Sequence, residues 1–345
     1  MTTHTHISGI TPRRIAWAAL ALSSVMLAMT LGPARALAGA QSTNAGYQWP
    51  VKPFDKQHPV RGSFADPRTM FNAAASLRGV LAGPGSFSLH RGVDIVAPDG
   101  SSVYPVVSGT VTYADDEWLK VDTGGGRAFE YWHIHPMVQV GAHVDAYQTV
   151  IGHIHRGSGH VHLTEVENGR KVNPLAPGHL GPYSDHTKPR VTSISFRGSE
   201  TGRDQLPTML RGRVLLVAGA EDEPTMSAPG AWSGLPVTPA LLTWEIHALG
   251  GKVVVGRHVA ADFRGNLPER SFWQVYARGT YQNMAVFRHH FSWGQPGSYL
   301  FKLAPRAFDT HTLKDGAYDL VVTATDIRGN SSSLARRFGV ANHRR

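Results

Sequence analysis

The stretch GSGHVHLTE, residues 157–165, places two histidines, His160 and His162, one residue apart. The surrounding residues favour a β-strand entered through glycines, and successive side chains of a strand point to opposite faces. The two imidazoles are therefore predicted to share one face of that strand. Such a pair can serve a metal site if the chain supplies further ligands elsewhere.

A second pair of candidate ligands lies upstream in LHRGVDIVAPDG, where His90 and Asp94 are four residues apart. On a regular strand these two side chains also share a face. Two imidazoles and one carboxylate, taken from this pair and the H-x-H element, have the composition of a catalytic zinc site whose fourth position is left to water. The chain has no cysteine, so any metal must be held by His, Asp or Glu.

Three separated motifs, HRGVDIVAPDGSSVYPVVSGTV, YWHIHP and GSGHVHLTE, resemble in order and spacing the lysostaphin-type zinc metallopeptidases, which cut peptide bonds in bacterial cell-wall peptidoglycan. The resemblance covers residues 51–175, under half of the chain. It implies one zinc ion per chain, held by His90, Asp94 and His162, with a zinc-bound water as the nucleophile. It also implies that His160 and His133, the latter from the Y-x-H element, are the catalytic histidines.

Other histidines near these motifs have different interpretations. His135 shares a strand face with His133 and is the alternative second catalytic histidine. His153 and His155 form another H-x-H pair, but no further ligand pairs with them at suitable spacing, so we expect loop or exposed-strand positions. Surface or satisfied polar positions are expected for three more histidines: His143, His289 and His290.

The residues after the H-x-H pair depart from the family pattern. Many relatives carry Phe-Glu directly after this pair, whereas this chain has Leu163, Thr164 and Glu165. We interpret the departure as affecting substrate fit more than metal binding. Glu165 and Glu167 are expected in solvent, and the alternative is that they orient a ligand histidine.

Short apolar runs separated by Gly, Pro, Asn and Asp predict an all-β chain with few helices. In the first half, strands are expected at residues 60–64, 91–97, 102–114, 118–124, 127–135, 149–154 and 160–166. The resemblance implies that residues 41–181 form an antiparallel sheet of lysostaphin type, a duplicated hybrid motif with a groove across it. Residues 182–190, rich in proline and polar turn-formers, are predicted to be a linker.

Beyond the linker, seven more strands are expected at residues 190–196, 213–220, 240–249, 252–263, 298–303, 318–326 and 335–342. In YDLVVTATD the apolar residues alternate, so that Tyr318, Leu320, Val322 and Ala324 fall on one face. The number and spacing of these strands predict an immunoglobulin-like β-sandwich over residues 191–345.

Residues 1–40 have the pattern of a cleaved signal peptide. Arg13 and Arg14 precede the apolar run IAWAALALSSVMLAMTL, and small residues follow in ARALAGA. An uncleaved anchor is the alternative, although the run is near the lower length limit for a membrane span. No later stretch is apolar enough to span a membrane. We expect a secreted or extracytoplasmic protein, in the periplasm or cell wall.

The net charge of +9 favours anionic partners such as peptidoglycan and other cell-wall polymers. Removing the arginines of the signal leaves about +6, spread along the chain without a Lys/Arg cluster, which argues against nucleic acid. The leading hypothesis is an exported zinc metalloendopeptidase, a peptidoglycan hydrolase acting on peptide stems or cross-bridges. The alternative is a non-catalytic wall-binding protein or activator of a separate hydrolase on the same fold. A third hypothesis, metal sequestration by the His-rich segment, predicts several weak sites.

Overall fold

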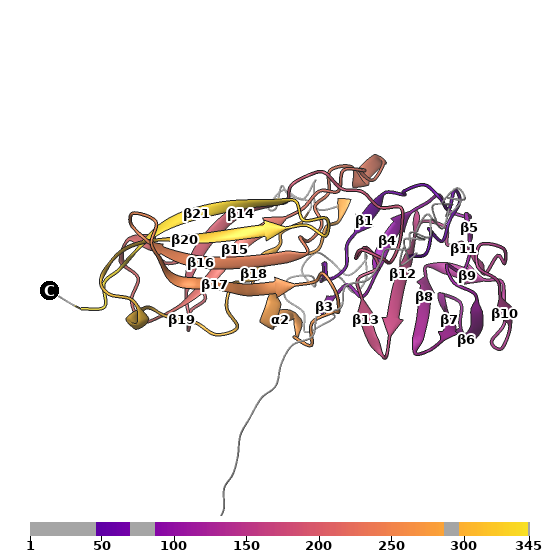
Figure 1. Ribbon diagram of the computed structural model, residues 1–345, viewed down its shortest axis with the longest axis horizontal. Coiled ribbons are helices and arrows are strands. Elements are labelled where there is room, and N and C mark those ends of the chain that lie inside the picture. The colour runs from indigo at the N-terminus through magenta and orange to yellow at the C-terminus, as the bar shows by residue number, and fades with distance from the viewer. Residues whose placement is uncertain (1–45, 70–86, 286–296, 344–345) are drawn as a thin grey trace, which may run out of the picture. The chain divides into compact units, whose positions relative to one another are not determined.

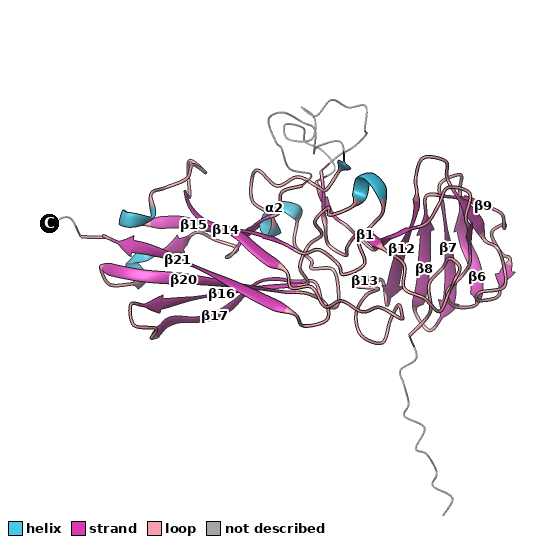
Figure 2. Ribbon diagram, turned by 90° about the horizontal axis from the view of Figure 1, so that it is seen from above, coloured by secondary structure: helices cyan, strands magenta, loops and turns pink. Residues whose placement is uncertain are grey.

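The computed structural model describes residues 46–69, 87–285 and 297–343, and strands dominate both halves of this part of the chain (Figure 1, Figure 2). The predicted signal peptide, His289 and His290 lie outside the described residues. Across the described ranges, no helix has the length and apolar character needed to cross a bilayer.

The first half is built around an antiparallel sheet in the order β1-β4-β12-β8-β7-β6-β10, with β13 paired to β12. Figure 2 shows β12, β8, β7 and β6 as neighbours. The strands of this sheet are β1 (Val60–Gly62), β4 (Val93–Val96), β6 (Gly109–Ala114), β7 (Trp118–Gly124), β8 (Arg127–Trp132), β10 (His143–Val144), β12 (His160–Glu167) and β13 (Arg170–Val172). Two small sheets accompany it, made of β5 (Ser102–Val103), β11 (Gly152–Ile154) and β9 (Ile134–Pro136), and of β2 (Pro67–Arg68) and β3 (Ser88–Leu89).

One face of the large sheet packs on an apolar core, and the period-two alternation of the strands explains why. Leu119 and Val121 of β7 are fully buried, while their neighbours on that strand are more exposed. In β12, Val161 and Leu163 point into the same core. The alternate residues of β12, among them His160 and His162, must then point to the opposite face. That opposite face carries the candidate site.

The second half contains two antiparallel sheets that contact each other (Figure 1). One consists of β14 (Arg190–Gly198), β15 (Arg213–Glu221), β18 (Leu300–Lys302) and β19 (Phe308–Asp309), and the other of β17 (Val253–Asp262), β16 (Leu241–Ala248), β20 (Gly316–Thr325) and β21 (Ser331–Val340). Short helical turns are α2 (Phe272–Val275), η1 (Pro207–Met209), η2 (Gly230–Trp232) and η4 (Thr310–Thr312). The residues of β20 predicted to share a face are all buried. The all-β, antiparallel prediction is confirmed, and the immunoglobulin-like assignment stays a prediction.

Candidate metal centre

Two central strands, β4 and β12, bring Asp94 and His162 together. The antiparallel register pairs Asp94 directly with His162, and pairs His162 on its other side with Trp132 of β8. Directly opposed residues of such a pair share a face, with Cβ atoms about 5 Å apart. Gly62 of β1 leaves room beside them, since a Cβ at that position would lie 2.5 Å from Asp94 Oδ2.

His90 reaches the same point from outside the strand, so the prediction that it shares a regular strand with Asp94 is wrong. In a regular strand the two residues would lie about 13 Å apart, too far to share one ion. Strand β4 begins only at Val93, and the chain bends at Gly92. A Cβ at Gly92 would lie 2.1 Å from the Leu163 carbonyl oxygen, so only glycine permits this close approach to β12.

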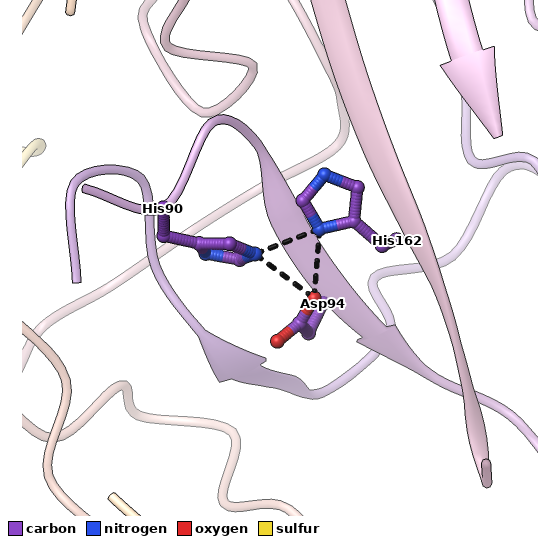
Figure 3. A group of neighbouring side chains, drawn as sticks. All are labelled: His90, Asp94 and His162. Atoms are coloured by element: carbon purple, nitrogen blue, oxygen red, sulfur yellow. Dashed lines mark hydrogen bonds and ion pairs between the residues drawn. The ribbon is translucent and has the colours of Figure 1, made fainter. Parts of the chain in front are cut away.

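The three side chains point at one another (Figure 3). His90 Nε2 lies 2.7 Å from His162 Nδ1 and 3.1 Å from Asp94 Oδ1, and His162 Nδ1 lies 3.0 Å from that same oxygen. All three residues are buried. Two ring nitrogens and one carboxylate oxygen thus form a compact triangle that is able to hold a metal ion.

The surroundings of the triangle keep its ligands in a usable charge state. His90 Nδ1 donates to the carbonyl oxygen of Ser63 at 2.8 Å, which leaves Nε2 with its lone pair. Burial lowers the pKa of His90 to about 3, and Arg68 acts in the same direction. Burial opposes ionisation of Asp94, but neighbouring positive charge, including that of the Arg68 guanidinium, outweighs it and holds the pKa of Asp94 well below its ordinary value. The Arg68 guanidinium donates to Asp94 Oδ2 at 2.8 Å and leaves Oδ1 to the triangle.

The Thr164 hydroxyl contacts the His162 ring on the side away from the triangle. Its Oγ1 atom lies 2.8 Å from His162 Nε2 and is fully buried on the same face of β12. When Nε2 carries the ring proton and donates it to this hydroxyl, Nδ1 presents a lone pair to the triangle. Thr164 thus contacts a candidate ligand histidine and also lines the cavity over the triangle, so the interpretation that the departure affects substrate fit more than metal binding stays a prediction. The signal for Thr164 in the sequence was its position two residues after His162, which places it on the ligand face.

His160 lies on the ligand face next to the triangle, as the H-x-H spacing predicts. Its Nδ1 donates to the Ser158 carbonyl oxygen at 2.7 Å, so the lone pair is on Nε2, which lies 3.6 Å from Asp94 Oδ1. Arg61 Nη2 lies 3.4 Å from the same Nε2 atom. Burial lowers the pKa of His160 to about 3, with Asp94 opposing and Arg61 reinforcing the shift. At neutral pH this imidazole is an unprotonated base.

His133 approaches the triangle from the junction of β8 and β9. The predicted strand 127–135 is interrupted here, because His133 has a left-handed backbone with φ 65°. A non-glycine residue in this region is uncommon and costs about 1 kcal/mol or more. The bend directs the ring to within 4.6 Å of the His160 ring and 6.4 Å of the His162 ring, measured between centroids. Burial lowers the pKa of His133.

The comparison with known families matches the segment that carries this arrangement. The sequence profile of peptidase family M23 matches residues 88–174, which include His90, Asp94, His133, His160 and His162. Residues 88–174 belong to peptidase family M23. Among curated proteins, none matches this chain.

Solved structures similar to the chain include a SpoIIQ–SpoIIIAH pore-forming complex (23% identity, 38% of this chain and 89% of that chain, TM-score 0.29). They also include a putative peptidase M23 from Pseudomonas aeruginosa (21% identity, 38% of this chain and 50% of that chain, TM-score 0.26). A third is a zinc-containing peptidase from Vibrio cholerae (20% identity, 37% of this chain and 39% of that chain, TM-score 0.29).

The alternative histidines of the M23 segment lie apart from the triangle. His135 and His155 contact each other with ring centroids 3.7 Å apart, and His135 lines a different cavity from the one beside the triangle. His153 pairs with His135 across strands β11 and β9, and its Nδ1 lies 3.4 Å from the Ser102 hydroxyl. His143 is exposed beside Asp145. None of these four histidines lines the cavity over the triangle, whereas His133 does.

Glu165 of the M23 segment is not in solvent, contrary to the prediction. Its side chain is fully buried on the core face of β12, opposite the ligands. It accepts hydrogen bonds from Arg127 Nε at 2.8 Å, Tyr47 Oη at 2.6 Å and His179 Nδ1 at 2.8 Å. It contacts no ligand histidine and instead holds segments from three parts of the chain together.

A cavity of about 290 Å³ lies over the triangle and is bordered by Trp132, His133, Arg68 and Glu130. An aromatic row continues from its edge across the sheet. Trp132 stacks on Trp118 with ring centroids 4.3 Å apart and planes 7° from parallel, and Trp118 stacks on Tyr113 at 4.2 Å. Tyr113 is 41% exposed, so the row ends in solvent. The triangle thus lies next to an exposed aromatic surface.

Proposed function

We propose that the protein is an exported zinc metalloendopeptidase that hydrolyses peptide bonds in the stems or cross-bridges of peptidoglycan. The observation that carries the proposal is the convergence of His90, Asp94 and His162 on one point, with two further imidazoles, His160 and His133, beside it. Family M23 membership supports peptidase chemistry at this point. The choice of peptidoglycan rests on the resemblance of the three motifs to wall-cleaving relatives.

The donor set fits zinc. Two imidazole nitrogens and one carboxylate oxygen with an open fourth position are a catalytic zinc set. Ligand atoms around a tetrahedral zinc lie about 3.3 Å apart, and the separations here, 2.7 to 3.1 Å, need to widen only slightly. The far nitrogens of both ligand histidines have partners, Ser63 and Thr164, that fix ring orientation. A bound zinc ion supplies Lewis-acid polarisation of the scissile carbonyl and lowers the pKa of water.

The two additional histidines supply proton transfer and charge stabilisation. The Nε2 lone pair of His160 accepts the proton of the attacking water, because Nδ1 is already committed to the Ser158 carbonyl. The same nitrogen later returns the proton to the leaving amine. The His133 ring, 4.6 Å from the His160 ring, donates to the oxygen on which negative charge develops.

The surroundings of the site suit an extended, partly anionic polymer. The cavity over the triangle and the aromatic row form a long contact surface for a peptide or glycan chain. The positive net charge, +9 for the full sequence and about +6 without the predicted signal, attracts an anionic cell wall. We propose that residues 191–345, predicted to be immunoglobulin-like, hold the catalytic domain on its substrate or partner.

The decisive experiment measures zinc content and the release of new amino termini from peptidoglycan for the mature chain and for His160→Ala. We expect one zinc per chain in both proteins. The variant should lose about 10²- to 10⁴-fold in rate, because its proton acceptor is gone. His153→Ala is the matched control, since His153 belongs to the other H-x-H pair and lies outside the site. It should retain both zinc and activity.

Two other outcomes would each support one of the alternative hypotheses. Zinc binding by the wild-type protein without release from several wall types would replace this proposal by the non-catalytic wall-binding or activator hypothesis. Binding of several zinc ions with low affinity would support metal sequestration.

A further inference from the structure

A second cavity is bordered by Arg61, whose guanidinium lies 3.4 Å from His160 Nε2. It has a volume of about 360 Å³, and its lining includes Ser158 and Gly159, which directly precede His160. Pro229 and Trp232 form the facing wall. The second cavity is therefore joined to the candidate site through Arg61 and through the two residues that precede His160.

Arg61 is fixed at the mouth of this second cavity. Its guanidinium lies over the Trp232 ring at 4.1 Å, a cation–π distance. The Arg61 carbonyl oxygen accepts from Asn283 Nδ2 at 2.9 Å, which anchors the backbone of β1. Arg61 Nη2 reaches within 3.4 Å of His160 Nε2. The side chain thus lies against an aromatic ring and is aimed at the proposed catalytic base.

Asp94 acts on the Arg61 guanidinium only from a distance, because Asp94 is already bound by Arg68. Within the described part of the chain Arg61 forms no ion pair, whereas the neighbouring Arg68 has both Asp66 and Asp94. The one carboxylate of the cavity, Asp99, accepts from the amides of Gly157 at 2.6 Å and Gly159 at 2.8 Å. A partly buried cation without a directly paired carboxylate is costly, so this arrangement favours an anionic ligand.

We propose that the second cavity is a carboxylate-binding subsite, in which Arg61 receives a free carboxylate of the peptide substrate next to the scissile bond. The proposal rests on the proposed peptidase function and adds to it a substrate class: peptides with a free carboxylate near the cleaved bond. A planar guanidinium binds a carboxylate through two parallel hydrogen bonds, and this geometry suits recognition better than a point charge does.

Occupation of the subsite also frees the base. While Arg61 donates to His160 Nε2, the lone pair needed for proton transfer is engaged. A substrate carboxylate draws the guanidinium toward itself and releases that lone pair. Substrate recognition and activation of His160 are coupled through this one side chain.

The test compares three matched stem peptides with the wild-type holoenzyme: one with a free terminal carboxylate, one with a terminal amide, and one with the amide and a side-chain carboxylate. We expect kcat/KM to be about 10- to 100-fold higher for a carboxylate peptide than for the amide. The two carboxylate peptides show which source the subsite accepts. In Arg61→Gln this ratio should fall to near one, and Arg61→Lys should restore part of it. Arg170→Gln, which removes an exposed charge outside the cavity lining, should keep the ratio.

Equal kcat/KM for all three peptides in the wild-type enzyme would overturn the subsite and leave the peptidase function standing. This comparison needs no variant, so a failure of Arg61→Gln to fold does not affect it. If no peptide is cleaved, the peptidase function fails, and calorimetric binding of the same peptides decides the subsite by itself. Tighter binding of a carboxylate peptide, lost in a folded Arg61 variant, would support it, and equal binding would reject it.

Discussion

The hydroxyl of Thr164 offers a sharp test of how this chain prepares its metal ligands. Thr164→Val removes that hydroxyl and keeps the branched shape of a fully buried side chain. In the metal-bound arrangement, His162 Nε2–H then has no acceptor, because its partner at 2.8 Å is gone. His162 Nδ1 no longer has a fixed tautomer facing the metal.

Two independent estimates of the expected loss in zinc affinity agree. Loss of the hydrogen-bond partner of a ligand histidine costs about 10- to 100-fold in metal affinity, which corresponds to about 1.4 to 2.8 kcal/mol. An unpaired buried donor costs about 1 to 3 kcal/mol. The metal-free protein suffers less, because His162 can place its proton on Nδ1 and donate to Asp94 at 3.0 Å. Zinc affinity should therefore fall by more than the free energy of unfolding of the metal-free form.

The assay is a competition titration of zinc between the protein and a chromophoric chelator, with urea unfolding of the metal-free forms alongside. Thr164→Ser keeps the hydroxyl and is the matched control, with an affinity close to that of the wild type. A zinc affinity of Thr164→Val within twofold of wild type would refute the reasoning. An equal loss in Thr164→Ser would also refute it, because the cause would then be packing.

Two further predictions concern buried carboxylates away from the triangle. Burial, reinforced by Asp185 and Asp326, raises the pKa of Asp222 to about 8, so the folded state holds a proton that the unfolded state releases above about pH 4. Stability should fall as the pH rises from about 4 to 8, and Asp222→Asn should have a higher Tm than wild type at pH 8; a lower Tm would contradict this. Glu165→Ala leaves Arg127, Tyr47 and His179 without their shared buried acceptor and should lower the free energy of unfolding by about 3 to 5 kcal/mol in urea titrations. A loss below about 1 kcal/mol would show that the network is dispensable.

Much of this molecule follows from local sequence rules. Alternation of apolar and polar residues locates β7 at its observed bounds, and it places His160 and His162 on one face of β12. These features depend on residues one or two positions apart, where backbone geometry alone decides the outcome. The same rule also places Thr164 with the ligands and Glu165 on the opposite, core-facing side.

The remaining features depend on contacts between distant segments. The pairing of Asp94 with His162 is a matter of strand register, which involves residues 68 positions apart. The bend at Gly92 exists because β12 lies against it, and no local pattern signals that contact. Glu165 has a polar side chain typical of a surface, but Arg127 and two other donors from distant segments satisfy it in the core.

The stacked indoles of Trp118 and Trp132 beside the triangle also provide an intrinsic spectroscopic signal for events at the site. Trp118 and Trp132 are nearly parallel at a centroid distance of 4.3 Å, close enough for their excited states to couple. Trp132 is the direct cross-strand neighbour of His162, so a ligand that shifts this ring changes the overlap of the two chromophores. Near-ultraviolet circular dichroism and tryptophan fluorescence should therefore follow metal loading and substrate docking without any label. The rates of the two events become accessible by stopped flow on the unmodified chain.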